Sequence, residues 1–244
     1  MKHVFFTILV SLLFSSATFA EMQSVNVGGQ NRQFYVHAPK GLTDNRPLLI
    51  SCHGMDQDIQ YQRGMAKWEE VADTANFLVV YPGGGTGFST WDISGDKDVN
   101  FILAIIDAMQ QKYSIDPNRV YMSGFSMGGM LTYHCMNMIP DYFAAFAPVS
   151  GYQFGGNPSA STRAIPIFHT HGTSDDVVHF EPYQNQEGIE AVINKWQKHN
   201  KCAGKTTSKV NNCATRTAYT DGECDADVVL NAIPNKGHWH SNDE

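Results

Sequence analysis

The segment Gly-Phe-Ser-Met-Gly at 124–128 limits the folds open to this chain more than any other part of its sequence. The apolar run 120–122 enters it with the character of a buried strand, and residues 127–138 leave it with the character of a helix. So tight a turn from strand to helix strains its central residue, and the flanking glycines let the backbone approach closely. The pattern predicts that the Ser126 hydroxyl is exposed at the carboxyl edge of a sheet, beside the amides of a helix N-terminus.

Short apolar runs alternate with longer helical segments along the rest of the chain. Strands that are apolar throughout and separated by helices are typical of a parallel sheet covered on both faces. We therefore expect an α/β fold with a mostly parallel central sheet and helices on both faces. The expected strands span 32–38, 47–52, 77–81, 120–122, 144–149, 165–170 and 228–233, and the expected helices span 62–75, 99–113, 127–138 and 187–199. No repeat or low-complexity linker interrupts the pattern, so residues 21–244 are expected to form a single domain.

The N-terminal twenty residues differ in character from the rest. Lys2 supplies a positive charge, residues 4–14 are almost wholly apolar, and small residues precede a cleavage position after Ala20. This order predicts a signal peptide over residues 1–20, because the apolar run is too short for a stable membrane anchor. The protein is therefore expected to be secreted, to the periplasm or the extracellular space, and to have no membrane partner.

Export would place the five cysteines in an oxidising compartment, where disulfides form. Cys202, Cys213 and Cys224 lie in a stretch rich in glycine, asparagine and threonine, in which one disulfide could brace a long loop. Three pairings exist, and the sequence does not choose among them. Cys52 falls in an apolar strand and Cys135 in an expected helix, so both are expected to be small buried side chains.

A serine hydroxyl needs a base to accept its proton before it becomes a useful nucleophile. In α/β-hydrolase folds an acid and then a histidine follow the serine along the chain. One expected strand ends shortly before Asp175, and Asp176 is the alternative acid. The last strand ends shortly before His238, which follows a glycine, and His240 is the alternative base. We predict a catalytic triad of Ser126, Asp175 and His238, in which the aspartate holds the imidazole tautomer.

The negative oxygen of a tetrahedral intermediate needs two hydrogen-bond donors. The backbone amide of Met127, directly after the serine, is the first predicted donor to this oxyanion hole. The second is expected in the turn after the strand at 47–52, and the amide of Met55 is our choice. His53 in the same turn looks catalytic at first sight, but we expect it to order the turn instead.

Six segments, taken in order, carry a family resemblance over nearly the whole chain after residue 20. They are LISCHG at 49–54, FLVVYP at 77–82, DVNFIL at 98–103, IDPNRVY at 115–121, GFSMGG at 124–129 and HGTSD at 171–175. They resemble the polyhydroxybutyrate-depolymerase-like esterases, a group that includes the feruloyl and acetyl xylan esterases of carbohydrate esterase family 1. The resemblance implies an α/β-hydrolase fold, the triad Ser126, Asp175 and His238, an oxyanion turn after His53-Gly54, and often a disulfide near Cys202.

Two features depart from that group. Its members often have cysteine or another small residue after the His-Gly pair, whereas this chain has Met55, so the carbonyl pocket is expected to be narrower or more apolar. The chain also stops six residues after His238, where related proteins usually continue through a final helix. We therefore expect either a cut C-terminal helix or a catalytic domain of a longer polypeptide.

Aromatic side chains occur in the loops expected at the carboxyl edge of the sheet. Trp91 and Trp239 are the predicted substrate-binding residues, with Phe88 and Tyr152 near them. Aromatic faces can stack on a hydroxycinnamoyl ring or a sugar. Together with export, this favours a serine esterase that removes feruloyl or acetyl groups from plant cell-wall xylan. The alternative is a polyhydroxyalkanoate depolymerase or a general short-chain esterase.

Other function classes are less well supported. The net charge of −7 argues against a nucleic-acid partner, because phosphate binding needs a basic patch. The expected chemistry needs no cofactor and no metal. Two H-x-H pairs, His169/His171 and His238/His240, leave a zinc-dependent hydrolase as one alternative, because alternate residues of a strand share a face. A noncatalytic carbohydrate-binding protein, in which Ser126 is dispensable, is the other.

Overall fold

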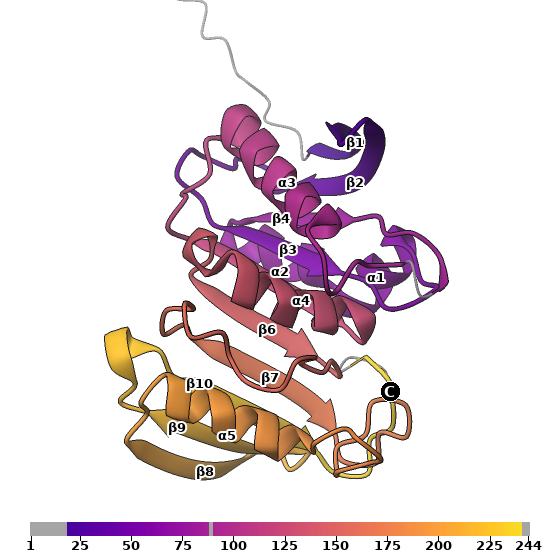
Figure 1. Cartoon of the computed structure of the whole chain (residues 1–244). Coiled ribbons are helices and arrows are strands. Elements are labelled where there is room, and N and C mark those ends of the chain that lie inside the picture. Colours follow the sequence, from indigo (N-terminus) through magenta and orange to yellow (C-terminus); the bar gives the residue numbers. More distant parts are fainter. Residues whose placement is uncertain (1–18, 88–89, 241–244) are drawn as a thin grey trace, which may run out of the picture.

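One sheet runs through the molecule (Figure 1). The computed structural model describes residues 19–87 and 90–240. Within them ten strands form a single sheet in the order β1-β2-β4-β3-β5-β6-β7-β10-β9-β8. The strands are β1 (Phe19–Val27), β2 (Gln30–Ala38), β3 (Leu48–Cys52), β4 (Leu78–Pro82), β5 (Val120–Phe125), β6 (Ala145–Val149), β7 (Ile167–Gly172), β8 (Gly204–Val210), β9 (Ala214–Thr220) and β10 (Val228–Ile233). The α-helices are α1 (Ile59–Ala66), α2 (Trp68–Ala75), α3 (Lys97–Tyr113), α4 (Met127–Met138) and α5 (Ile189–His199).

The six central strands, from β4 across to β10, run parallel to one another. β3 and β4 are buried along their whole length, which explains why their sequences LLISC and LVVYP lack polar alternation. The outer strands β1, β2, β9 and β8 pair antiparallel. The expected mostly parallel central sheet is confirmed.

Helices α3, α4 and α5 cover one face of this sheet (Figure 1). Their buried side chains, such as Phe101 and Trp196, form one core with Met122 and other inward side chains of the central strands. Helices α1 and α2 cover the other face near β4, where Ala72 packs in a second core with Tyr81. Helices therefore lie on both faces, as the sequence pattern predicts.

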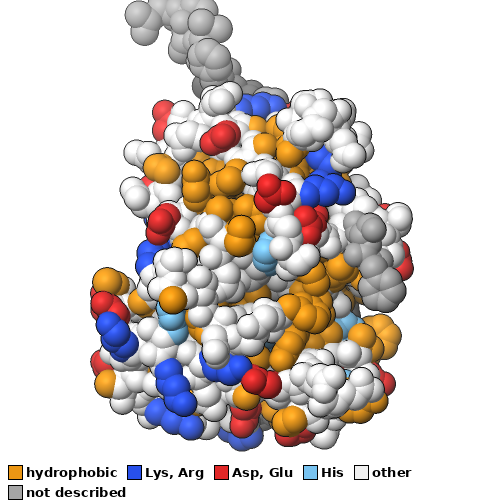
Figure 2. Space-filling view, in the orientation of Figure 1, with side chains coloured by type: hydrophobic (Ala, Val, Ile, Leu, Met, Phe, Trp, Pro, Cys, Tyr) orange, Lys and Arg blue, Asp and Glu red, His pale blue; other side chains and the backbone are white. Residues whose placement is uncertain are grey.

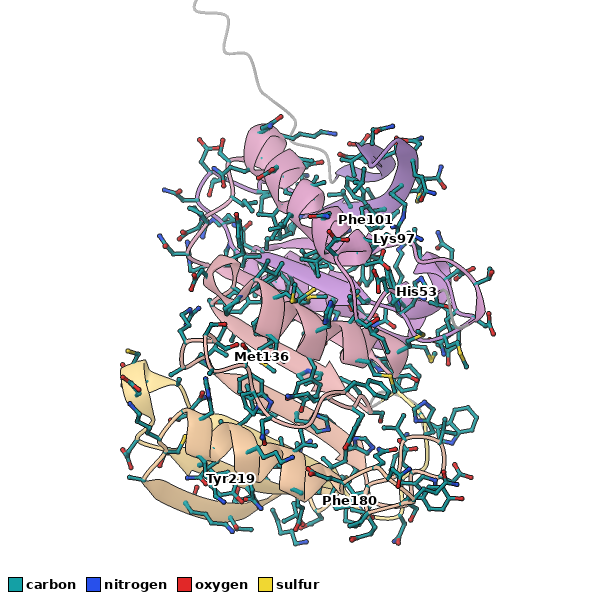
Figure 3. The ribbon with its side chains drawn as sticks, in the orientation of Figure 1. His53, Lys97, Phe101, Met136, Phe180 and Tyr219 are labelled. Carbon is teal, nitrogen blue, oxygen red and sulfur yellow. The ribbon has the colours of Figure 1, made fainter. Side chains whose placement is uncertain are left out.

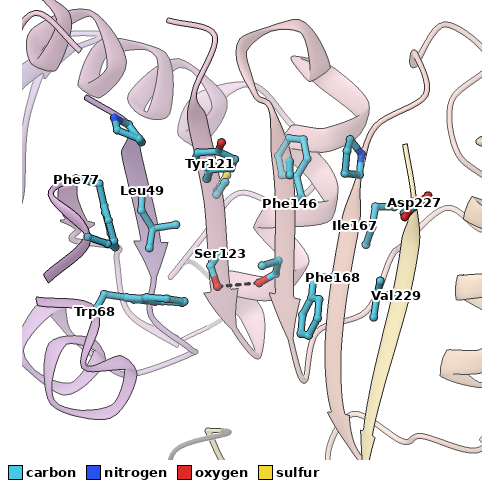
Figure 4. Close-up of a pocket in the computed structure, with 16 residues that line it drawn as sticks. Leu49, Trp68, Phe77, Tyr121, Ser123, Phe146, Ile167, Phe168, Asp227 and Val229 are labelled. Carbon is cyan, nitrogen blue, oxygen red and sulfur yellow. Dashed lines mark hydrogen bonds between the residues drawn. The ribbon is translucent and has the colours of Figure 1, made fainter. Parts of the chain in front are cut away.

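Beyond α2 the second face of the sheet carries an open apolar groove of about 560 Å³ (Figure 4). Leu49 and Phe168 lie on its floor, and Trp68 of α2 stands at one side. Ser123 also lies there, with its hydroxyl donating to the Ala147 carbonyl at 2.7 Å. No residue that the sequence predicts for catalysis lines this groove, so the candidate site lies elsewhere.

The helix expected at 62–75 is in fact two helices. They meet at Lys67, whose φ of 52° and ψ of 30° are left-handed. The Lys67 amide donates to the Arg63 carbonyl at 3.1 Å and closes the end of α1. Buried side chains occur on both sides of the break, at Ala66 and Ala72, so the apolar pattern alone does not reveal it.

The stretch expected as a long loop braced by a disulfide is instead a β-hairpin. β8 pairs with β9 around a turn at Asn211 and Asn212, whose φ angles are 47° and 56°. All five cysteines are free thiols, so the expected disulfide is absent from this structure. Cys213 is exposed at the hairpin turn and Cys224 is exposed after β9, whereas Cys202 is buried with its Sγ 3.5 Å from the Ala226 carbonyl. Cys52 and Cys135 are buried, as expected.

Residues 1–18, which hold nearly all of the expected signal peptide, lie outside the described residues. β1 begins at Phe19, and Ala20 lies opposite His37 of β2. Among the helices within 19–87 and 90–240, none combines the length and apolar character needed to cross a membrane.

Lysine and arginine side chains gather over α5 and the β8–β9 hairpin (Figure 2). Lys198, Lys201, Lys205 and Lys209 are exposed there. Two charges of this region are paired with carboxylates: Lys195 with Glu187, and Lys201 with Glu223 at 2.7 Å. These lysines form a solvated face.

Candidate active site

Ser126 occupies a sharp turn between β5 and α4. Its φ of 53° and ψ of −118° are strained for a residue with a Cβ, and strain of this kind persists where the surroundings fix it. The Ser126 amide donates to the Val149 carbonyl of β6 at 2.9 Å. The turn predicted from the 124–128 motif is present, with the serine at its apex.

Two glycines make this turn sterically feasible. A Cβ at Gly124 would lie 2.3 Å from the Gly128 carbonyl oxygen. A Cβ at Gly128 would lie 2.4 Å from the Cys52 carbonyl oxygen at the end of β3. Because neither position has room for a methyl group, glycine allows α4 to start directly against β3 and β5.

The structure brings Ser126, His238 and Asp175 together in one hydrogen-bonded series. His238 Nε2 lies 2.8 Å from Ser126 Oγ, and His238 Nδ1 lies 2.8 Å from Asp175 Oδ2. A carboxylate accepts but does not donate, so Nδ1 carries the proton and Nε2 is free to accept from the serine hydroxyl. This arrangement can move the proton of Ser126 to His238 while Asp175 stabilises the resulting imidazolium.

The Asp175 carboxylate is held on both oxygens. Oδ1 accepts the amides of Val177 and Val178 at 3.0 and 2.8 Å, and Oδ2 faces His238 and His171. Burial by itself raises the pKa of Asp175, but hydrogen bonds from His171 and His238 outweigh it and hold the pKa below its ordinary value. Asp176, the alternative acid, is exposed.

Neighbouring strands explain how residues so far apart in the sequence meet. β7 and β10 pair in parallel, so the loops after them leave the sheet side by side. The Thr173 amide donates to the Ile233 carbonyl at 2.9 Å, and the Ser174 amide donates to the Lys236 carbonyl at 3.0 Å. The Asn235 amide donates in turn to Thr173 Oγ1 at 3.0 Å. These bonds fix the aspartate loop against the histidine loop.

The two predicted oxyanion donors lie on elements that meet at this turn. Met127 is the first residue of α4, and the first amides of a helix have no acceptor within the helix. Met55 follows Gly54, at which a Cβ would lie 3.2 Å from the ring of Phe125, the residue before the serine. Their role as donors stays a prediction.

His53 orders the turn after β3, at the carboxyl end of the strands (Figure 3). Its Nε2 accepts the Gly84 amide at 2.9 Å, so its Nδ1 carries the proton and donates to the Gly54 carbonyl at 2.8 Å. Burial lowers the pKa of His53, although the bond to Gly54 opposes this. A neutral imidazole with both nitrogens bound to backbone is a structural clamp.

The side chain of Trp91 is buried, although the sequence predicts that it contacts the substrate. Its side chain is 1% exposed, and its Nε1 donates to the His53 carbonyl at 2.8 Å. With its ring packed on that of His53 at 4.8 Å, it has no free face for a substrate, so the predicted substrate contact of Trp91 is wrong. Trp239, next to His238, is 61% exposed and keeps its predicted availability.

Two neighbouring aromatic residues complete the predicted set. The Tyr152 hydroxyl accepts the Glu187 amide at 3.0 Å, which ties this buried ring to another loop. Phe88 lies outside the described residues.

His240, the alternative base, is buried with its ring 5.6 Å from that of Phe125, and the ring of His238 lies 5.1 Å from the same ring.

The pair His169 and His171 does not have the free nitrogens that a zinc site needs. His169 Nε2 lies 2.9 Å from His171 Nδ1, His169 Nδ1 lies 2.8 Å from the Tyr133 hydroxyl, and His171 Nε2 lies 2.8 Å from the Val178 carbonyl. Within the described ranges, no group of three or more His, Cys, Asp and Glu side chains is arranged to hold a metal ion. Sequence reasoning missed the contact of His171 with Asp175, although the H-x-H spacing singled out both histidines.

Comparison with known proteins places the chain in a family. Residues 49–213 match the family described as phospholipase/carboxylesterase. The bifunctional acetylxylan esterase/xylanase XynS20E of Neocallimastix patriciarum is 45% identical over 217 residues, which cover 87% of this chain and 31% of that protein. Feruloyl esterase B of Thermothelomyces thermophilus is 30% identical over 198 residues, which cover 76% of this chain and 63% of that protein.

The fold comparison agrees with the topology described above. An acetyl xylan esterase from Aspergillus awamori superposes with a TM-score of 0.72 at 18% identity, covering 90% of this chain and 94% of that one. The chain thus spans less than two thirds of the length of both sequence relatives but nearly the full length of this structural neighbour. With residues 49–213 matched and the α/β-hydrolase sheet in place, the chain belongs to the phospholipase/carboxylesterase family.

Proposed function

We propose that this chain is a serine carboxylic-ester hydrolase that uses Ser126, His238 and Asp175 as its catalytic triad. The observation that carries the proposal is the series of 2.8 Å contacts from Ser126 Oγ to His238 and from His238 to Asp175. Family membership and the strained serine turn support the same reading.

In the first half of the reaction, Ser126 Oγ attacks the ester carbonyl while His238 Nε2 takes the hydroxyl proton. The negative oxygen that forms is bound by the amides of Met127 and Met55. The C–O bond to the alcohol then breaks, and His238 gives its proton to the departing alkoxide. The alcohol leaves, and the acyl group remains on Ser126.

In the second half, water takes the place of the alcohol. His238 accepts a proton from the water as its oxygen attacks the acyl carbonyl. Collapse of this second intermediate breaks the bond to Ser126 Oγ, which recovers its proton from His238. Asp175 stays ionised throughout and keeps the imidazole in its acceptor tautomer, in agreement with its lowered pKa.

For the substrate, we propose acetyl or feruloyl esters of plant cell-wall xylan. The sequence relatives carry the names acetylxylan esterase and feruloyl esterase, and the higher identity is with the former. Exposed Trp239 beside His238 offers an aromatic face on which a sugar or a hydroxycinnamoyl ring can stack. We further propose that residues 1–20 direct export, which suits a polymer too large to enter a cell.

The test is a substrate panel on the purified protein. Acetylated xylan, methyl ferulate, polyhydroxybutyrate and p-nitrophenyl acetate are compared, and we expect hydrolysis of the simple ester and of at least one xylan-type ester. Ser126→Ala is expected to lower kcat by at least about 10⁴-fold. Ser208→Ala, which alters an exposed serine of β8, is the matched control and should leave kcat unchanged.

Three results would contradict the proposal or a part of it. Full activity of Ser126→Ala, or inhibition by chelators without labelling by a serine-directed fluorophosphonate, would remove the serine mechanism. Activity on polyhydroxybutyrate alone would overturn the xylan substrate and leave the triad in place.

A further inference from the structure

Three buried side chains extend the hydrogen-bonded series behind Asp175. His169 and His171 are alternate residues of β7 and so point to the same face of the sheet. Helix α4 covers that face (Figure 1), and its Tyr133 meets His169. All three side chains are at most 1% exposed, and Phe180, at the carboxyl end of the strands in Figure 3, closes the far side of His171 with its ring 6.0 Å away.

The bond directions in this series follow from one carbonyl group when His171 holds a single ring proton. The Val178 carbonyl only accepts, so His171 Nε2, 2.8 Å away, carries the proton. A neutral His171 then accepts at Nδ1, so His169 donates to it from Nε2. His169 in turn accepts at Nδ1, so the Tyr133 hydroxyl donates at 2.8 Å. Each of the three side chains therefore donates toward Asp175.

Burial keeps the groups in these protonation states. Burial lowers the pKa of His169 well below its ordinary value, so this ring stays neutral. Burial raises the pKa of Tyr133, so its hydroxyl stays a donor. These two groups therefore keep their charge states, and the Tyr133 hydroxyl keeps donating to the neutral ring of His169.

The end of the series contacts the carboxylate that serves the proposed base. His171 Nε2 lies 3.2 Å from Asp175 Oδ2, the same oxygen that faces His238 Nδ1 at 2.8 Å. The proton on His171 is thus shared between the Val178 carbonyl and the carboxylate. It opposes rotation of the carboxylate and stabilises its negative charge.

Building on the proposed triad, we propose that Tyr133, His169 and His171 are positioning residues that form a buried donor relay. The relay holds Asp175 ionised and turned toward His238. It transfers no proton; it fixes which atoms carry protons.

Two neutral imidazoles inside a core are unusual if packing is their sole task. Apolar residues at 169 and 171 would fill the same strand face without the desolvation of four ring nitrogens. Fully satisfied buried networks instead specify one arrangement of protons and side chains. A triad carboxylate needs such a fixed arrangement, because its orientation sets the tautomer of the histidine.

The relay predicts a pH effect as well as a rate effect. The titratable groups that face the carboxylate are His171 on β7 and His238 on the final loop, while Tyr133 on α4 faces His169. Without the His171 donor, Asp175 binds a proton more readily and attracts the protonated imidazole of His238 more strongly. Both effects move the acid limb of the kcat/KM profile to higher pH.

The kinetic test compares variants that remove or keep a donor. His171→Leu removes it, and we expect kcat to fall about 10-fold, KM to change less than about 2-fold, and the acid limb to rise by roughly 0.5 to 1 pH unit. His171→Gln restores an N–H and should recover most of both losses. Tyr133→Phe keeps the ring and removes the outer donor, so a smaller shift in the same direction is expected. Unchanged acid limbs in all folded variants would overturn the relay.

A measurement that needs no activity separates this proposal from the proposed function. ¹⁵N NMR of the histidine-labelled protein reports the tautomer of each ring, and His169 and His171 should both be Nε2–H at the pH of highest kcat/KM. An Nδ1–H or charged form of either ring at that pH would refute the relay even if the esterase activity is present. The expected tautomers in a protein that hydrolyses no ester would leave the relay standing and remove the proposed function.

Discussion

Asp175→Asn changes the charge of the site with little change of shape. Asp175 Oδ1 accepts two backbone amides, those of Val177 and Val178, and in asparagine only the amide oxygen can take that place. The new NH₂ group must therefore stand where Oδ2 stands. There it faces two ring N–H groups, on His238 at 2.8 Å and on His171 at 3.2 Å.

A donor facing a donor forces His238 to move its proton. Nδ1 becomes the acceptor and Nε2 carries the hydrogen, yet Nε2 is the atom 2.8 Å from Ser126 Oγ. An N–H there cannot take the serine proton. The expected fall in kcat is about 10⁴-fold, the size found when a triad aspartate elsewhere is replaced by asparagine. It corresponds to roughly 5 kcal/mol in the activation free energy.

The assay is hydrolysis of p-nitrophenyl acetate, with thermal unfolding as a check on folding. Asp176→Asn is the matched control, since it makes the same chemical change on the exposed neighbouring carboxylate, and it should alter kcat less than about 2-fold. If Asp176→Asn loses the activity and Asp175→Asn keeps it, the assignment of the acid is refuted.

Asp175 also makes stability depend on pH. Its pKa is lower in the folded protein than in the unfolded chain, so its contribution is fully present above about pH 4 and is lost as pH falls toward the folded pKa. Asp175→Asn should therefore flatten the acid side of the curve of melting temperature against pH. An acid side as steep as that of the wild type would show that this carboxylate is not held ionised by the fold.

Two further predictions concern packing and the substrate. Gly128→Ala places a methyl group 2.4 Å from the Cys52 carbonyl oxygen, so we expect the free energy of unfolding in urea to fall by about 1–3 kcal/mol, with loss of ester hydrolysis. Gly64→Ala in α1, where nothing lies within 4 Å, should instead be neutral or stabilising by up to about 1 kcal/mol, and equal losses in both would contradict the close approach. Trp239→Ala should raise KM for methyl ferulate and leave the melting temperature unchanged, whereas Trp91→Ala should destabilise the fold by about 3–5 kcal/mol. An unchanged KM for methyl ferulate in Trp239→Ala would contradict the proposed stacking of the substrate on this ring.

The bounds of helices and strands that end at turns and pack on the core were predictable from the local sequence pattern. β10 (Val228–Ile233) and α4 (Met127–Met138) have the predicted bounds. The sequence pattern missed β1, β8 and β9. β1 and β8 are edge strands, and the side chains of β8 are nearly all exposed, so no apolar alternation marks it. Backbone pairing holds it to β9, and the one local signal was Asn211-Asn212, a pair that tolerates the positive φ of a hairpin turn.

The positions of residues near the serine were predictable where the order and direction of the strands alone determine them. Ser126, Asp175 and His238 follow β5, β7 and β10, whose parallel directions bring their carboxyl ends to one edge of the sheet. Trp91 also lies in a loop at this edge, but its indole N–H meets the His53 carbonyl and the ring turns inward. A loop position in the sequence indicates nearness to the site and does not decide which way a side chain faces.

For the H-x-H pair on β7, the sequence predicted which way the side chains face but not what they contact. Period-two spacing placed His169 and His171 on one face, and that much is correct. What the pair does depends on what the fold sets against that face. A carboxylate cluster there would favour a metal ion, whereas the fold supplies a tyrosine hydroxyl at one end and the Val178 carbonyl with Asp175 at the other. Because a donor at one end and acceptors at the other orient every proton between them, the same two histidines become a fixed series of hydrogen bonds aimed at Asp175.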